Sequence, residues 1–194
     1  AEKLEAVNTI LNINGKLKGY NTDVHGFEKG LKILKNWNKE KPVIVIGAGG
    51  AAESIVYSLI KKSSKNIYVM NRTLSKAKKL QNKYSNIISA KWLSYDIINE
   101  ASLIINTTSL GMIGCPNLSI NLQNASKDLK VYDIVYNPQN TDLIKEAKKR
   151  NLDHITGLSM FLGQAEKSFK IWFKKSQLID KKLLKIIKKQ LNIK

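Results

Sequence analysis

Residues 43–52, VIVIGAGGAA, constrain the fold of this chain more than any other stretch. Four apolar residues predict a short buried strand, and the glycine-rich turn leads directly into a helical pattern. A strand, a G-x-G-x-x-A turn and a helix in this order are typical of a dinucleotide-binding βαβ unit. We expect Gly47 to form the tight turn. The residues expected to bring backbone N–H groups to a pyrophosphate are Gly49, Gly50 and Ala51.

The rest of the chain alternates between strand and helix patterns. Further apolar runs, each short enough for a strand, occupy residues 66–71, 87–90, 101–108, 129–136 and 154–157. Amphipathic stretches such as 75–84 and 141–151 lie between them. Buried strands that alternate with amphipathic helices predict an α/β fold with a Rossmann-type, doubly wound parallel sheet. Before this region, Asn14-Gly15 between two extended runs predicts a β-hairpin. After it, the sequence predicts two helices, over residues 158–173 and 176–194.

The end of the second strand, VMNRT, indicates which dinucleotide is bound. An NAD-binding unit usually carries Asp or Glu there, about 20 residues after the glycines, to bind the ribose 2′-hydroxyl. This chain has no acid at that point. Its Asn71, Arg72 and Thr73, with Lys76 in the next helix, offer donors that suit a 2′-phosphate. The predicted cofactor is therefore NADP.

Charge and composition limit the other partners. The formal net charge is +18, but only two of the 33 basic residues are arginines, and the lysines are spread along the chain. We interpret this as lysine at exposed positions rather than a nucleic-acid surface, because Arg is the preferred reader of phosphates and bases. No apolar run reaches the length of a membrane span. The lone Cys115 fits a reducing cytoplasm, and no Cys or His spacing predicts a metal site.

Several separated segments together resemble the shikimate dehydrogenases. In order, they are AVNTI, GYNTDVHGF, VIGAGGAA, NRTLSKAKKL, INTTSLGM, DIVYNPQNT and GLSMFLGQAEKSFKIW, and they cover residues 1 to about 173. The resemblance implies NADPH-dependent reduction of 3-dehydroshikimate to shikimate, a step of chorismate and aromatic amino-acid biosynthesis. It also implies a remnant of the substrate domain at 1–22, the NADP-binding domain at 23–157 and C-terminal helices at 158–194.

The resemblance implies roles for particular residues. Asp23 matches the acid of the family's catalytic Lys–Asp pair. The other positions that match substrate-binding residues are Asn8, Tyr136 and Gln164. The glycine turn and the VMNRT residues match the pyrophosphate and 2′-phosphate contacts. The residues that match the nicotinamide side of the cleft are Thr107, Ile134 and Gly157.

The chain departs from the family pattern at its start, at Glu53 and in its last predicted helix, 176–194, which is more basic than expected. The family carries about 80 more residues before the position matched by Ala1, including the catalytic lysine, so we expect this chain alone to bind NADP(H) with little turnover. Glu53 places a negative charge near the glycine turn, where relatives often have Arg. The alternatives left open are a non-catalytic NADP-binding domain, a quinate/shikimate dehydrogenase-like protein and a glutamyl-tRNA reductase-like protein. The sequence does not indicate an oligomeric state.

Overall fold

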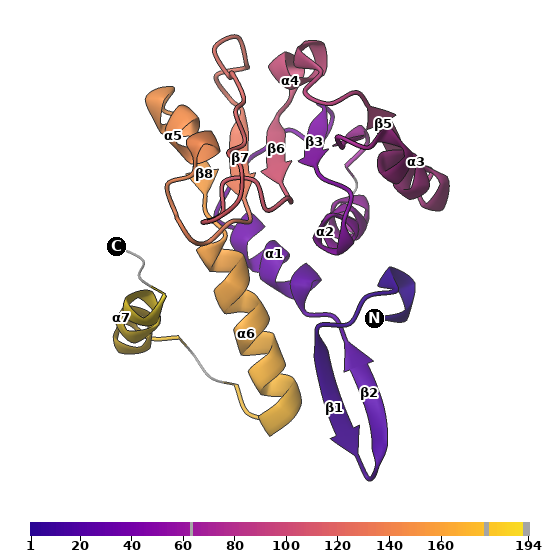
Figure 1. Ribbon diagram of the computed structural model, residues 1–194, viewed down its shortest axis with the longest axis vertical. Helices are drawn as coiled ribbons and strands as arrows, with labels where there is room; N and C mark the ends of the chain where they lie inside the picture. Colours follow the sequence, from indigo (N-terminus) through magenta and orange to yellow (C-terminus); the bar gives the residue numbers. More distant parts are fainter. Residues whose placement is uncertain (63, 177–178, 192–194) are drawn as a thin grey trace.

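A six-stranded parallel sheet forms the centre of the computed structural model, which describes residues 1–62, 64–176 and 179–191 (Figure 1). The strand order is β5-β4-β3-β6-β7-β8. Strands β3 to β5 are added toward one edge of the sheet, and β6 to β8 are added beside β3 toward the other edge, so the order reverses between β3 and β6. The bounds are β3 (Val43–Ile46), β4 (Ile67–Met70), β5 (Ile87–Ala90), β6 (Leu103–Asn106), β7 (Lys130–Asp133) and β8 (His154–Ile155). All five pairings are parallel. The predicted α/β Rossmann-type class is confirmed.

Helices cover both faces of this sheet. Successive residues of β3 point to opposite sides: Val43 and Val45 join one apolar cluster, and Ile44 and Ile46 join the other. Both faces are therefore buried, which explains why the strand is continuously apolar. The helices that contribute to the first cluster are α1 (Asp23–Leu31), α2 (Gly50–Lys61), α3 (Leu74–Lys83) and, through Met160, α6 (Leu158–Phe173). Those that contribute to the second are α4 (Tyr95–Glu100) and α5 (Asp142–Lys149).

A long helix, α6 (Leu158–Phe173), runs from the sheet toward an antiparallel hairpin of β1 (Thr9–Ile13) and β2 (Lys16–Tyr20) (Figure 1). Two hydrogen bonds join the hairpin to this helix. The Thr9 and Ser168 hydroxyl oxygens lie 2.8 Å apart, and Trp172 Nε1 donates to the Ile10 carbonyl at 3.0 Å. A short 3-10 helix, η1 (Glu2–Leu4), precedes the hairpin.

The last helix, α7 (Lys181–Gln190), lies beside α6 (Figure 1). The sequence predicted a helix over 176–194. The structure begins it later because the Asp180 side chain accepts a hydrogen bond from Leu183 N at 2.7 Å and so caps it. Residues 177–178 and 192–194 of the predicted helix lie outside the described residues. Within the described part of the chain, no helix is both long and apolar enough to span a membrane.

The structure also corrects the strand lengths and adds elements that the sequence did not indicate. The strands predicted over 101–108 and 129–136 end at Asn106 and Asp133, because the chain there leaves the sheet for loops. Helix α4 and the 3-10 helix η1 were missed, since each has too few residues to show a clear periodicity.

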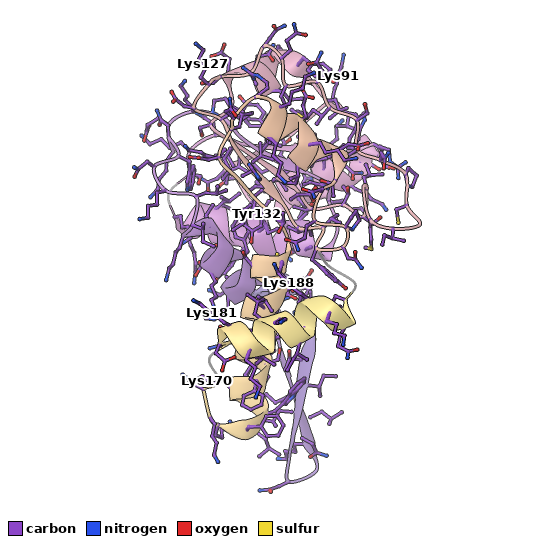
Figure 2. All side chains as sticks on the ribbon, turned by 90° about the vertical axis from the view of Figure 1, so that its left-hand side faces the viewer. Lys91, Lys127, Tyr132, Lys170, Lys181 and Lys188 are labelled. Atoms are coloured by element: carbon purple, nitrogen blue, oxygen red, sulfur yellow. The ribbon has the colours of Figure 1, made fainter. Side chains whose placement is uncertain are left out.

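Figure 2 shows where the lysines and the interior lie. Lys91 and Lys127 are at one end of the molecule, Lys170 is toward the other, and Lys181 and Lys188 are on α7 between them. Tyr132 lies inside the sheet domain, where its ring stacks on Phe27 with centroids 5.2 Å apart. These five lysines are therefore spread along the length of the molecule in this view.

Candidate cofactor and substrate site

A cavity of about 290 Å³ lies at the carboxyl ends of the central strands, where the sheet order reverses. Open α/β sheets bind ligands at this point. The cavity brings together residues that the sequence separates by up to 141 positions, as with Asp23 and Gln164. The predicted site residues that line it are Asp23, Ala51, Thr107, Ile134, Tyr136, Gly157 and Gln164.

The Asp23 carboxylate is held by two amide side chains. Asn8 Nδ2 donates to Asp23 Oδ1 at 2.8 Å, and Gln164 Nε2 donates to the same oxygen at 2.7 Å. Asn8 is fixed in turn, because its Oδ1 accepts from Thr22 N at 3.0 Å and from the Thr22 hydroxyl at 3.1 Å. Since both amides donate to Oδ1, the carboxylate is anchored through one oxygen and can offer Oδ2 to a ligand.

Burial changes the acidity of this group. Desolvation raises the pKa of the Asp23 carboxyl above its usual value of 3.8, and the neighbouring amide side chains of Asn8, Asn21 and Gln164 oppose that rise. A carboxyl group at the start of a helix would ordinarily be favoured in its charged form. Here its position in the cavity outweighs that preference, as is typical of groups that take part in binding or proton transfer.

Two glycines allow α1 and α6 to approach closely enough for this contact. A Cβ on Gly163 would lie 2.8 Å from Gly26 Cα, and a Cβ on Gly26 would lie 2.4 Å from the Met160 carbonyl oxygen. Neither position tolerates a side chain without the helices moving apart. Since Asp23 is on α1 and Gln164 is next to Gly163, this close packing sets their separation.

The glycine turn after β3 has the geometry expected of a phosphate loop. Gly47 has φ +112°, and a Cβ there would lie 2.5 Å from Thr107 Oγ1. Thr107 is fixed against the same turn, since its hydroxyl donates to the Ile46 carbonyl at 2.8 Å. Gly49 and Gly50 are exposed, with open space where a Cβ would be. Helix α2 begins there without a side-chain cap, so its first N–H groups face solvent.

The residues predicted to bind the 2′-phosphate lie outside the cavity, at the carboxyl end of β4. Arg72, Thr73 and Lys76 are exposed, and Asn71 is half-buried. Asn71 Nδ2 donates to the Thr73 carbonyl at 2.8 Å, which fixes the turn that carries Arg72. Because β3 lies between β4 and β6 in the sheet, the glycine turn lies between this group and the cavity. The residues predicted to bind the cofactor therefore follow one another along the carboxyl edge of the sheet, from β4 past the glycine turn to the cavity.

Glu53 does not present a free charge to the glycine turn. Its carboxylate pairs with Lys83 Nζ at 2.6 Å and accepts from the Tyr84 hydroxyl at 3.4 Å. Lys83 also pairs with Glu5 at 3.0 Å. The Glu53 carboxylate is therefore paired with a lysine of α3, which it shares with Glu5.

Other lining residues were not found from the sequence. They are Thr108, Ser109, Met112, Val135, Met160 and Phe161. Phe161 stacks on Tyr136 with centroids 4.8 Å apart, so the two rings form one wall. Met160 could have been found, since it precedes Gln164 by one helical turn on the same side of α6. The loop residues carry no periodic pattern. Among the described residues, no three His, Cys, Asp or Glu side chains gather in a way that could hold a metal ion.

The fold and site geometry agree with one family of known proteins. A family model described as shikimate / quinate 5-dehydrogenase matches residues 28–158. The chain belongs to the shikimate / quinate 5-dehydrogenase family. It is 41% identical over 180 residues to the shikimate dehydrogenase (NADP(+)) of Caldanaerobacter subterraneus subsp. tengcongensis, with 89% of this chain and 64% of the relative covered.

Solved structures of the family share the architecture. A shikimate 5-dehydrogenase from Thermus thermophilus, in complex with NADP(H) and shikimate, has a TM-score of 0.83 at 27% identity, and the match covers 98% of this chain and 70% of that one. A quinate dehydrogenase from Corynebacterium glutamicum, in complex with NAD, has a TM-score of 0.86 at 27% identity, covering 96% and 69%. The chain spans slightly less than two thirds of the length of such curated relatives.

Proposed function

We propose that this chain provides the NADP-binding half, and part of the substrate site, of a shikimate dehydrogenase that uses NADPH to reduce 3-dehydroshikimate to shikimate. The cavity carries this proposal. It joins a hydrogen-bonded carboxylate, Asp23, to the end of a dinucleotide crevice at Ala51 and Thr107. Reduction of a ketone needs a hydride donor, groups that orient the substrate and a proton source, and such a cavity can place all three together.

The chain's own residues fit NADP(H). We assign the pyrophosphate to the open backbone at Gly49, Gly50 and Ala51, and the 2′-phosphate to Asn71, Arg72, Thr73 and Lys76. The nicotinamide end is assigned to the cavity beside Thr107, Ile134 and Gly157. When bound, the cofactor supplies the hydride. The conformation of Gly47 and the uncapped start of α2 support this assignment.

The substrate residues in this proposal are Asp23, Asn8, Tyr136 and Gln164. Asn8 and Gln164 hold Asp23 Oδ1, so that Oδ2 can accept a hydrogen bond from a substrate hydroxyl or from a lysine ammonium group. Among the described residues, no lysine forms an ion pair with Asp23. We therefore expect the 194-residue chain alone to bind NADPH but to turn over little substrate.

The hairpin supports the proposed division of the chain at residue 22. One of its faces packs on α6, while Ile10, Ile13 and Leu17 leave 57%, 45% and 73% of their surfaces exposed. A two-stranded hairpin is only marginally stable alone. We assign residues 1–22 to a substrate domain, residues 23–157 to the NADP-binding domain and residues 158–194 to helices that join the two.

The remaining partner assignments follow from the surface. The spread of lysines along the sequence and the presence of only two arginines favour a protein without a nucleic-acid partner. We expect a protein of the cytoplasm that acts on a small molecule, without membrane association.

Nucleotide binding and turnover test these proposals together. The 194-residue chain should bind NADPH more tightly than NADH, and the longest gene product that contains this sequence should oxidise shikimate with NADP⁺. Quinate, assayed beside shikimate, tests the second candidate substrate, which the likeness to a quinate dehydrogenase favours. NADPH binding without turnover in the longer product would indicate a non-catalytic domain. Absence of NADP(H) binding in both would refute the proposal.

A further inference from the structure

The two sides of the cavity near the proposed nicotinamide position are loops, not regular elements. One loop follows β6 and contributes Thr107, Thr108 and Met112, and the other follows β7 and contributes Ile134 and Tyr136. A planar ring that must present one atom to a substrate needs both walls fixed. A displacement of about 1 Å can reduce the rate of a well-oriented reaction by about 100-fold. Something must therefore hold the loops in place.

Each loop begins at a buried polar residue. Asn106 ends β6 and Asp133 ends β7, and the two are direct partners in the parallel register. Neither residue has any exposed surface. Asn106 Nδ2 donates to Asp133 Oδ1 at 2.9 Å, so the starting points of the two loops are tied to each other by side chains as well as by the sheet.

The Asn106 amide organises the first loop. Its Oδ1 accepts from the Thr108 backbone N–H at 3.1 Å and from the Thr108 hydroxyl at 2.7 Å. Its Nδ2 also donates to the Leu110 carbonyl at 3.2 Å. A single side chain thus fixes the loop that borders the cavity at both Thr108 and Leu110.

The Asp133 carboxylate organises the second loop. Its Oδ1 accepts from Val135 N at 3.0 Å, and its Oδ2 accepts from the Thr141 hydroxyl at 2.6 Å. Thr141 Oγ1 in turn accepts from Ile144 N at 3.3 Å and caps α5. The loop is therefore held at Val135, beside the cavity, and at Thr141, where it enters the next helix.

The sheet itself does not need this polar pair. The preceding residues of the two strands, Ile105 and Tyr132, are buried and form apolar packing. Burial raises the pKa of the Asp133 carboxyl, and no cation contacts it among the described residues, so the charged group is unfavourable there by itself. Its hydrogen bonds to Asn106, Val135 and Thr141 offset this cost, and they fix the loops.

We propose that Asn106 and Asp133 are positioning residues, which hold the two loop walls at the separation required by the nicotinamide end of NADP(H). This inference rests on the proposed function, since it assigns that end of the cofactor to the cavity. Neither residue lines the cavity, so neither acts on the ligand directly. Their effect should fall on the nicotinamide half alone, because the groups assigned to the adenosine half lie at β4 and at the glycine turn.

Two ligands separate the halves of the cofactor in the experiment. NADPH fills the whole crevice, whereas 2′,5′-ADP has the adenosine and its phosphates but no nicotinamide. In the 194-residue chain, Asn106→Ala should weaken NADPH binding by roughly tenfold or more, and change 2′,5′-ADP binding by less than about twofold. Both dissociation constants can be measured by calorimetry, with the thermal midpoint recorded for each variant.

Substitutions at Thr141 give a milder matched pair. Thr141→Val removes the hydroxyl that donates to Asp133, so it should weaken NADPH binding and leave 2′,5′-ADP binding unchanged. Thr141→Ser keeps the hydroxyl, so it should bind NADPH as the parent chain does. If Asn106→Ala does not fold, the comparison of Thr141→Val with Thr141→Ser tests whether the Asp133 hydrogen bonds position the loops. Equal weakening of both ligands, or unchanged NADPH binding in the folded variants, would overturn the inference alone. If the parent chain binds neither ligand, the proposed function fails as well.

Discussion

Arg72 is an exposed guanidinium on a turn that its neighbour Asn71 fixes. A charge-assisted hydrogen bond to phosphate contributes about 1.5–3 kcal/mol, so Arg72→Ala should weaken NADPH binding roughly 10- to 150-fold. NADH lacks the 2′-phosphate, and its affinity should change little. The two affinities can be compared by calorimetry on the same preparations.

Lys127→Ala is the matched control for that experiment, because it removes one exposed positive charge just before β7, at the opposite end of the sheet. It should leave the ratio of NADPH to NADH affinity unchanged. If Arg72→Ala also leaves that ratio unchanged, the 2′-phosphate is bound elsewhere.

Asp23→Asn should make the fold more stable at neutral pH. Burial raises the folded-state pKa of Asp23 above 3.8, so the ionised form destabilises the native state at pH values above the folded pKa. This destabilisation disappears below pH 3.8, where Asp23 is protonated in both states. The substituted amide has no charge, and its carbonyl oxygen can still accept from Asn8 and Gln164.

Urea unfolding at a series of pH values measures this effect. The stability gained by the Asp23→Asn variant should be near zero in acid and should grow as the pH rises through the folded pKa. The longer gene product with this substitution should lose shikimate oxidation. A variant that is less stable than its parent at neutral pH would show instead that the ionised carboxylate stabilises the fold.

The contact between α1 and α6 depends on a residue without a side chain. Gly163→Ala should raise helix propensity by about 1 kcal/mol, yet its Cβ would meet Gly26 Cα at 2.8 Å. Overpacking typically costs about 1–3 kcal/mol, so the net change should be a loss of stability. As the helices separate, Gln164 should withdraw from Asp23, and the pKa of Asp23 should rise further. Urea unfolding and an NMR titration of Asp23 measure the two effects.

Ala165→Gly provides the comparison on the same helix, since Ala165 is exposed. It should cost about 1 kcal/mol through helix propensity and leave the pKa of Asp23 where it was. A Gly163→Ala protein whose Asp23 pKa equals that of the parent would show that helix spacing does not set the hydrogen bond.

The charge of the whole molecule predicts opposite effects of salt on folding and on binding. With a net charge of +18, self-repulsion should destabilise the native state, and salt screens it. The urea midpoint should therefore rise between about 0.05 M and about 0.5 M NaCl, while the affinity for the anionic cofactor should fall.

A charge-reduced variant tests the cause of the stability change. Replacement of exposed α7 lysines by Gln should reduce the rise of the urea midpoint with salt; suitable positions are Lys181, Lys182, Lys185 and Lys189. A midpoint that falls with salt in the parent would mean that surface ion pairs outweigh the repulsion.

The sequence was sufficient where function depends on neighbouring residues. The buried strand Val43–Ile46 and the glycine turn after it were predicted in place, because apolar content and backbone freedom are local properties. Helix α6 was predicted with its observed bounds, because its 16 residues are enough to show a clear helical pattern. The residue roles taken from the family resemblance stay predictions until they are tested.

Only the folded chain shows how distant groups meet. The hydrogen bond from Gln164 to Asp23 depends on how closely α1 and α6 pack, and the one from Asn106 to Asp133 depends on the order of strands in the sheet. Such contacts join residues far apart in the chain and leave no periodic pattern, so the sequence named Asp23 and Gln164 by resemblance and missed the other pair. The local sequence determined which cofactor the crevice suits. The packing of helices and strands decided the shape of the cavity, because shape depends on distances between elements that the chain order does not fix.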